Sequence, residues 1–447
     1  MKNLTEGDSG KLIFAFAIPM LIGNVFQQLY SIINSIIVGH FIGKTALAAV
    51  GASFPIIFML ISFVVGVTMG TTIVISQFFG AKDMTKVKRA IDTMYIFLFF
   101  ASLGLMALGL LLSRPLLVMI NLPDDVMPQA LEYFNTYMLG MVFFFGFNGI
   151  SSVLRGLGDS KTPLYFLIIS TVVNIILDLI FISVFKWGVR GAALATIIAQ
   201  GGAFLSSVIY LNRTHDLIKF AWRKFIFDKQ IFKSILNIGL PTGFQQTFVS
   251  VGMLAIMWIV NGFGTDVIAA YSVAGRIDNL ASLPAMNFGA ALSAFVGQNI
   301  GAGKMERVKL GLRATLKMST ILAVITSIFI IIFREPLMAM FTPDKNVIAI
   351  GAEYLTVVAS FYVIFSTMFV IGGVMRGAGD TLIPMFITLL SLWLIRIPAA
   401  LIMSKHFGVD GIWWSVPIAW FIGMSLSYLY YLTGRWKTKS IVKKTPF

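Results

Sequence analysis

Asp178 is the residue with the clearest capacity for chemistry, because it is a carboxylate in the middle of an apolar run, the segment NIILDLIFI. An ionisable side chain inside hydrocarbon is costly, so each such residue is a functional candidate. Asn174 precedes Asp178 by four residues, so both side chains project from one face of a helix. This pair predicts a site in which an amide flanks a carboxylate.

Two other apolar runs carry polar residues at the same spacing, Tyr30 with Asn34 and Thr196 with Gln200. If these faces converge, they surround one carboxylate with neutral oxygen ligands. Burial favours the uncharged form of a carboxylic acid, so such a pocket could bind a proton; its oxygens could instead bind a hard cation such as Na⁺. The alternative is that these groups form hydrogen bonds between helices that only support packing.

Arg276 and Asp278 form a second charged cluster inside an apolar run. Residues two apart do not face each other on a helix, so each is expected to have a different partner, with that of Arg276 on another helix. We interpret them as structural or gating charges, with substrate contact as the alternative. Arg396, in a later run, has the same status.

The chain contains 40 Phe and 23 Met, residues that could line an adaptable apolar cavity for flat, drug-like ligands. Most of them must face lipid or fill the core. The candidates for a cavity lining are Phe145, within FFFGF, and Phe361.

The motifs of common enzyme classes are absent from the sequence. It has no GxxxxGK[ST] phosphate loop and no HExxH pair, and its three histidines are His40, His215 and His406. It also has no cysteine, which excludes disulfides and thiolate metal sites. We therefore expect neither an enzyme nor a bound cofactor, and any transport must use an ion gradient or a partner.

The composition is that of a membrane protein, with 58% hydrophobic and 12% charged residues and a mean hydropathy of +0.89. Twelve apolar runs are long enough to cross roughly 30 Å of hydrocarbon as helices. Helices are expected because an open strand would leave backbone groups unsatisfied in lipid. The expected spans are residues 12–40, 46–79, 90–112, 129–153, 163–185, 190–211, 234–262, 267–300, 313–333, 350–374, 382–404 and 409–433.

The net charge of +15 could indicate nucleic acid as a partner, but its distribution indicates membrane topology instead. Of the 34 Lys and Arg residues, 25 lie in or next to the termini and the loops after even-numbered spans, and seven follow odd-numbered spans. Cationic loops stay in the cytoplasm. We therefore expect a multi-pass protein of the plasma (inner) membrane with both termini cytoplasmic and no nucleic-acid partner.

The two halves of the chain repeat each other at an offset of 221 residues. The turn RGLGDSKTP at residues 155–163 recurs as RGAGDTLIP at residues 376–384. Other matches include Gln77 with Gln298, Gly80 with Gly301, Glu132 with Glu353, and Tyr133 with Tyr354. Six spans per copy make these parallel repeats.

This duplication predicts an N-lobe at residues 1–211, a cytoplasmic linker at 212–233, a C-lobe at 234–434 and a basic cytoplasmic tail at 435–447. The linker includes LIKFAWRKFIFDKQIF, whose aromatic and basic residues suit a helix lying in the membrane interface. Pro19 and Pro241 occupy nearly matching places early in the first and seventh spans, where each can kink its helix.

The chain resembles the multidrug and toxic compound extrusion (MATE) family of secondary transporters along nearly its whole length. The resemblance rests on LYSIINSIIVGHFIGKTALAAVG, on SQFFGAKDMTKVKRA with its repeat GQNIGAGKMERVKLG, on RGLGDSKTP, and on NIILDLIFI followed by GVRGAALATIIAQ. It implies two six-helix lobes and expulsion of substrate as H⁺ or Na⁺ enters.

The resemblance also implies a cation or proton site at the positions matching Tyr30, Asn34, Asn174, Asp178 and Thr196, which are the residues reached above from spacing. Asn34 departs from the pattern, since the family commonly has an aspartate there.

A cation site in the C-lobe is not expected. Family members that have one use acids in the seventh and tenth spans, whereas this chain has Gln245 and Gln246 in the seventh and, in the tenth, Glu353 near the outer end. The two glutamines remain candidates for substrate contact or gating.

We therefore expect a monomeric antiporter that exports drug-like, cationic or amphipathic compounds, with H⁺ favoured over Na⁺. A flippase for lipid-linked precursors, a channel and a non-transporting membrane scaffold remain alternatives. The basic loop motif of the major-facilitator fold is absent, which excludes that arrangement of two six-helix copies.

Overall fold

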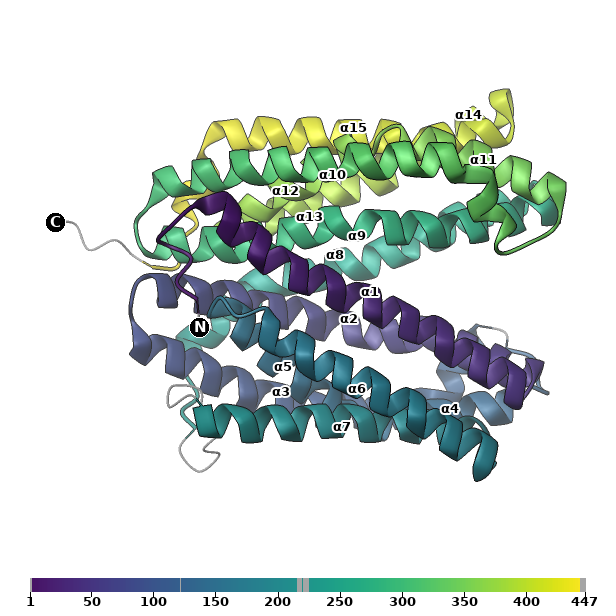
Figure 1. The fold of residues 1–447 in the computed structure, drawn as a ribbon, viewed down its shortest axis with the longest axis horizontal. Helices are drawn as coiled ribbons and strands as arrows, with labels where there is room; N and C mark the ends of the chain where they lie inside the picture. Colours follow the sequence, from purple (N-terminus) through teal and green to yellow (C-terminus); the bar gives the residue numbers. More distant parts are fainter. Residues whose placement is uncertain (1, 121, 215–218, 220–224, 443–447) are drawn as a thin grey trace. The chain divides into compact units, whose positions relative to one another are not determined.

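The computed structural model describes residues 2–120, 122–214, 219 and 225–442, and the regular structure of these residues is helical. Two compact units divide the chain, unit 1 at Met1–Lys2 and Ile22–Gly243 and unit 2 at Asn3–Leu21 and Phe244–Phe447. The helices of the first half are α1 (Ser9–Phe41), α2 (Lys44–Gly80), α3 (Met84–Met119), α4 (Met127–Leu139), α5 (Met141–Gly156), α6 (Lys161–Leu179), the π-helix η1 (Ile180–Val184) and α7 (Gly188–Thr214) (Figure 1).

The second half repeats this series, with an additional helix after its π-helix and a 3₁₀ turn at its end. Its elements are α8 (Lys229–Asn261), α9 (Thr265–Gly301), α10 (Met305–Ala339), α11 (Lys345–Ala359), α12 (Tyr362–Ala378), α13 (Leu382–Leu389), the π-helix η4 (Leu390–Arg396), α14 (Ile397–Phe407), α15 (Val409–Thr433) and the 3₁₀ turn η5 (Arg435–Thr438).

Ten helices or continuous helical segments of the described chain are long and apolar enough to cross a membrane. Two more spans result when α4 with α5 and α11 with α12 are each counted as one span bent by 50°. The fold class and the twelve expected spans are thereby confirmed. The break between α4 and α5 falls at Gly140, where an added Cβ would lie 2.5 Å from Cγ1 of Ile197, and glycine is a common cause of a sharp kink.

The repeat predicted from the sequence also sets the bounds of the helices. α2 and α9 each have 37 residues and begin 221 residues apart, at Lys44 and Thr265. The residues before them, Gly43 and Gly264, have φ values of 112° and 94°, a conformation that side chains other than glycine rarely adopt. The internal duplication is therefore visible in the turns as well as in the helices.

The first helix of each half, α1 or α8, is divided between the two units, which the sequence did not indicate. The division falls after Leu21 in α1 and after Gly243 in α8, two residues beyond Pro19 and Pro241 respectively. The predicted lobe bounds and the proline kinks stay predictions. What the structure adds is that the first part of α8 packs within unit 1 and the first part of α1 within unit 2.

Small residues allow this packing in unit 1. A Cβ added to Gly66 on α2 would lie 2.5 Å from the carbonyl oxygen of Gly239 on α8, so the two backbones are in direct contact. Close approach of backbones at glycine is typical of helix pairs in membranes. In unit 2 the first part of α1 instead contributes Ile13, Phe16 and Ala17 to an apolar core that contains Phe288 and Phe295 of α9.

The expected interfacial helix of the linker and the end of the basic tail lie in part outside the described residues, at 215–218, 220–224 and 443–447. The described end of the linker is bound to α3. The backbone N–H of Asp228 donates to Oγ1 of Thr93 at 2.9 Å, and its carboxylate lies 3.5 Å from Nη1 of Arg89. In the tail, Trp436 is buried and stacks on Tyr431.

Candidate functional site

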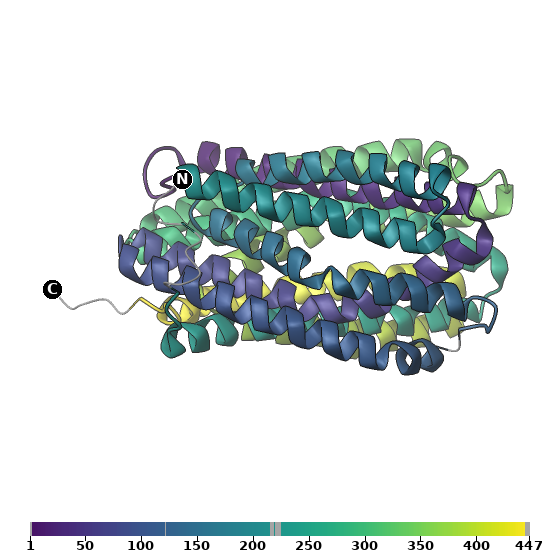
Figure 2. The same ribbon diagram turned by 90° about the horizontal axis from the view of Figure 1, so that it is seen from below.

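Three helices of unit 1 bring together the polar residues expected around Asp178. Tyr30 and Asn34 come from α1, Asn174 and Asp178 from α6, and Thr196 from α7; Figure 2 shows α6 and α7 side by side. Tyr30 Oη lies 3.1 Å from Thr196 Oγ1, and Asn34 Nδ2 donates to Tyr30 Oη at 3.0 Å. Asn174 Nδ2 donates to Thr196 Oγ1 at 3.5 Å. The four-residue spacings therefore identified side chains that meet in space.

The hydrogen bonds of this cluster have a direction. Thr196 Oγ1 donates to the carbonyl oxygen of Ala192 at 3.1 Å, so Tyr30 must donate to Thr196. Tyr30 in turn accepts from Asn34. The hydroxyl protons of Thr196 and Tyr30 are thus both used in hydrogen bonds to groups other than Asp178.

Three acceptor oxygens are left without a donor. Asp178 is fully buried, and among the described residues neither of its carboxylate oxygens nor Oδ1 of Asn174 has a hydrogen-bond partner. A buried charge without a partner is strongly unfavourable, and so is a buried acceptor without a donor. A proton on Asp178, or a small cation between these oxygens, would relieve both costs.

The backbone changes next to this carboxylate. Asp178 is the second-last residue of α6, and the π-helix η1 begins at Ile180. π-Helical turns widen the backbone and are frequent at functional sites. No pattern in the sequence predicted this turn.

Two tyrosines of α4 also belong to this region and were not predicted as site residues. Tyr133 is buried and interacts electrostatically with Asp178, and Tyr137 forms a hydrogen bond with Gln200. The sequence does contain a signal for Tyr133, because this residue is duplicated as Tyr354. The second cluster, described next, shows the role of Tyr354 and so explains the duplication.

The second cluster lies in unit 2 around Asp278 of α9. Tyr362 donates to its Oδ1 at 2.8 Å and Tyr354 to its Oδ2 at 3.4 Å. Arg396, the last residue of η4, is buried and interacts electrostatically with the same carboxylate. The duplicated tyrosine thus interacts with an acid of a membrane span in each unit, Tyr133 with Asp178 and Tyr354 with Asp278.

Arg276 differs from expectation. Its side chain is exposed, and it forms no ion pair or hydrogen bond with any residue that the structure describes. The expectation of a partner on another helix is therefore wrong for this conformation. Two residues along a helix turn the side chain by about 200°, so Arg276 lies away from the face that carries Asp278.

Asp178, which is fully buried, and Asp278, which is partly buried, have opposite surroundings, and these decide which acid is the better binding group. Asp278 accepts hydrogen bonds from two tyrosine hydroxyls and interacts electrostatically with Arg396, so its carboxylate oxygens already have partners within the protein. Asp178 has no donor in the described chain and no nearby cation among the interactions that the structure records. Asp178 is the better candidate for binding an ion that comes and goes.

The remaining candidates lie at separate places. Gln245 donates to Oγ1 of Thr388 at 2.6 Å, and Gln246 is partly buried. Phe145 is buried in unit 1, and Phe361 packs edge-on against Trp414. Their roles in substrate contact or gating stay predictions.

A family model described as MatE matches residues 19–180 and 241–402, one segment in each repeat. The chain belongs to the MATE family. It is 34% identical to the "Probable multidrug resistance protein YpnP" of Bacillus subtilis, with 98% of each chain covered. It is 28% identical to the "Probable multidrug resistance protein NorM" of Thermotoga maritima, covering 97% of this chain and 94% of that one.

Solved structures show the same fold. A structure described as the outward-facing conformation of a multidrug resistance MATE family transporter superposes with a TM-score of 0.89 at 24% identity, covering 97% of this chain and 98% of that one. A MOP superfamily transporter from Pyrococcus furiosus superposes with a TM-score of 0.91 at 23% identity, with the same coverage. The chain is thus a multi-pass membrane protein of a family of multidrug efflux transporters.

Proposed function

We propose that this protein is a secondary active antiporter that exports organic, cationic or amphipathic compounds by alternating access, in exchange for H⁺ with Na⁺ as the alternative ion. The observation that carries the proposal is the fully buried Asp178, whose two oxygens lack hydrogen-bond donors in the described chain beside an equally unpartnered Oδ1 of Asn174. A buried carboxylate that the protein itself leaves uncompensated is suited to bind an ion reversibly.

The composition of the site favours the proton. A Na⁺ ion here would have one carboxylate and otherwise only neutral oxygens, because the position that is commonly acidic in the family is Asn34, whose amide nitrogen points to Tyr30. A proton removes the charge of Asp178 outright and needs no second anion. Na⁺ remains the alternative because Asn174 Oδ1 is a free oxygen ligand beside the carboxylate.

The test is substrate transport by reconstituted Asp178→Asn protein. Export of a fluorescent organic cation is measured in liposomes under an imposed pH gradient, and separately under a Na⁺ gradient. Asp178→Asn should abolish both substrate-driven proton flux and uphill transport. Asp125→Asn, which alters an exposed acid in a loop, serves as the matched control and should transport normally.

Four outcomes contradict the proposal. Uphill transport that persists in Asp178→Asn places the coupling site elsewhere, with Asp278 the next candidate. Substrate movement that never exceeds its gradient in the unaltered protein indicates a channel, and no movement indicates a scaffold. Transport of lipid-linked substrates in place of organic cations supports the flippase.

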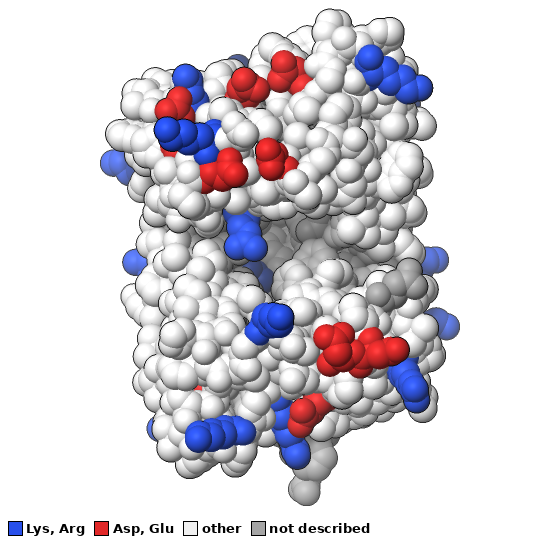
Figure 3. Space-filling model, turned by 90° about the vertical axis from the view of Figure 1, so that its right-hand side faces the viewer, with Lys and Arg blue, Asp and Glu red and all other residues white. Residues whose placement is uncertain are grey.

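We also propose that both termini face the cytoplasm, that the protein resides in the plasma membrane and that it works as a monomer. The charge distribution supports the orientation. The end of the helices seen in Figure 3 carries acidic side chains together with basic ones, whereas most Lys and Arg residues belong to the opposite loops and termini. A cationic excess on one side is the usual mark of the cytoplasmic face.

A further inference from the structure

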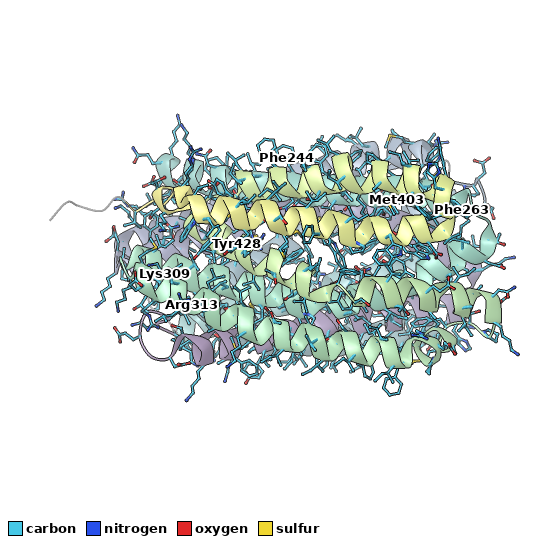
Figure 4. The ribbon with its side chains drawn as sticks, turned by 90° about the horizontal axis from the view of Figure 1, so that it is seen from above. Phe244, Phe263, Lys309, Arg313, Met403 and Tyr428 are labelled. Carbon is cyan, nitrogen blue, oxygen red and sulfur yellow. The ribbon has the colours of Figure 1, made fainter. Side chains whose placement is uncertain are left out.

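A row of exposed cations runs along one face of α10 in unit 2. Lys309, Arg313 and Lys317 follow each other at intervals of four residues, so their side chains lie one above another. Figure 4 shows Lys309 and Arg313 near one end of the helices. Since a single acid, Glu306, pairs with Lys309 at 2.8 Å, this face keeps a net positive charge.

The depth of these cations in the membrane follows from the length of the helix. The sixteen residues between Lys317 and Arg334 carry no charge and, with the two ends, span about 25 Å at 1.5 Å per residue. The hydrocarbon layer is roughly 30 Å thick, so Lys317 lies near its boundary. Arg313 and Lys309 then lie about 6 and 12 Å further out, at the level of lipid phosphates.

The tail adds cations at the same level. Lys437 interacts electrostatically with Glu306, as do Lys309 and Arg313, and Lys437 Nζ lies 5.7 Å from the ring centroid of Trp436. Tyrosine and tryptophan are typical of the membrane interface, so this cluster of cations and rings marks one membrane surface of unit 2.

An apolar groove opens beside this patch, towards the membrane interior. Its volume is about 440 Å³, and it is lined by Thr367 of α12 and by Met424, Ser425, Tyr428 and Leu429 of α15. Tyr428 and Leu429 are exposed, although they lie in a membrane span. Tyr431, one turn beyond Tyr428, interacts electrostatically with both Lys309 and Arg313. The groove therefore ends within one helical turn of a tyrosine that interacts with the cations.

We infer that unit 2 binds an anionic glycerophospholipid, with its phosphate on Lys309, Arg313 and Lys437 and an acyl chain in the groove beside Tyr428. Charge complementarity selects an anionic headgroup, because Arg and Lys clusters at the cytoplasmic membrane surface attract such lipids. The apolar groove selects a lipid over a soluble anion, because only a lipid brings an acyl chain. This inference does not depend on the transport mechanism or on the coupling ion.

The test compares lipids by native mass spectrometry of the full-length protein in a neutral detergent. Phosphatidylglycerol and phosphatidylcholine with identical acyl chains are titrated, and the affinity for the first bound lipid is measured. The unaltered protein should prefer phosphatidylglycerol at least ten-fold. Each cation near a membrane surface contributes roughly a factor of five, so Lys309→Gln with Arg313→Gln should weaken phosphatidylglycerol binding by about 25-fold and leave phosphatidylcholine binding unchanged.

Two further variants separate the headgroup from the chain. Ser425→Phe fills the groove and should weaken the binding of both lipids. Lys345→Gln with Lys405→Gln removes two exposed cations from the opposite end of unit 2 and should change neither.

The inference is overturned if the Lys345→Gln, Lys405→Gln control loses as much affinity for phosphatidylglycerol as the Lys309→Gln, Arg313→Gln variant. It is overturned as well if the Lys309→Gln, Arg313→Gln variant, like the control, binds phosphatidylglycerol as tightly as the unaltered protein does. It is also overturned if inorganic phosphate at millimolar concentration displaces phosphatidylglycerol completely, because the patch would then bind free anions. Equal affinity of the unaltered protein for phosphatidylglycerol and phosphatidylcholine would also overturn the inference.

Discussion

Asn34→Asp should convert a site built around one carboxylate into a site with two, and should strengthen the dependence of transport on Na⁺. Asn34 is buried, and its amide lies 3.0 Å from the Tyr30 hydroxyl, which also interacts electrostatically with Asp178. An acid at this position adds a second negative charge beside the three unpartnered oxygens. A cation held there would be compensated by two anions.

The size of the effect follows from two opposed contributions. A cation about 4 Å from the added carboxylate gains roughly 4 kcal/mol at an effective dielectric constant of about 20. Removing the new carboxylate from water costs several kcal/mol and offsets most of that gain. A net gain of about 1 to 3 kcal/mol corresponds to Na⁺ binding roughly 5- to 150-fold more tightly.

The assay is substrate export from proteoliposomes as a function of Na⁺ concentration, at pH 8 and without a pH gradient. The gain should shrink as the pH falls, because two neighbouring carboxylates readily share one proton, which cancels the added charge. Asn148→Asp is the matched control: Asn148 is on α5 of the same unit, and its amide donates to the carbonyl oxygen of Phe144. An unchanged Na⁺ dependence in folded Asn34→Asp protein, or an equal change in Asn148→Asp, would refute the assignment of position 34 to the ion site.

Two further predictions concern packing and helix capping. Gly66→Val should lower the midpoint of thermal unfolding strongly, because the added Cβ would lie 2.5 Å from the backbone of Gly239 and overpacking costs about 1 to 3 kcal/mol or more. Gly104→Val is the control and should change the midpoint little, because no atom lies within 4 Å of its added Cβ. Asp83→Ala should cost about 1 kcal/mol of stability at pH 7, because Asp83 accepts from the backbone N–H of Lys86 at 3.0 Å, a bond that holds the pKa of its carboxyl below the usual 3.8. A carboxyl group with a lowered pKa stabilises the folded protein above its ordinary pKa, and this stabilisation is lost as the pH falls through the lowered pKa. The difference in stability between the unaltered protein and Asp83→Ala should therefore vanish only well below pH 3.8. A difference in stability that stays constant down to pH 2 would contradict this.

Much of the fold was predictable because its determinants are local or repeated in the chain. The length of each apolar run predicts a span, and the constant offset of 221 residues predicts the duplication that recurs in helix bounds such as those of α2 and α9. The Asp178 cluster was predictable for the same reason. A spacing of four residues places Asn174 with Asp178, and Tyr30 with Asn34, on single helix faces whatever the rest of the chain does.

Other features depend on contacts between distant segments and could not be derived from spacing. The division of α1 and α8 between the two units depends on which backbones pack together, as Gly66 does with Gly239. The roles of Tyr133 and Tyr354 follow from bent spans that bring each ring to an acid on another helix.

The sequence by itself determined that the chain is a duplicated bundle of membrane helices with acids inside apolar spans at Asp178 and Asp278, because hydropathy and helical periodicity are properties of contiguous residues. Only the tertiary structure decided which acid is poised to bind an ion. Hydrogen-bond donors to a buried carboxylate come from other helices: Tyr354 and Tyr362 reach Asp278, whereas the hydroxyls around Asp178 are committed to Thr196 and Ala192.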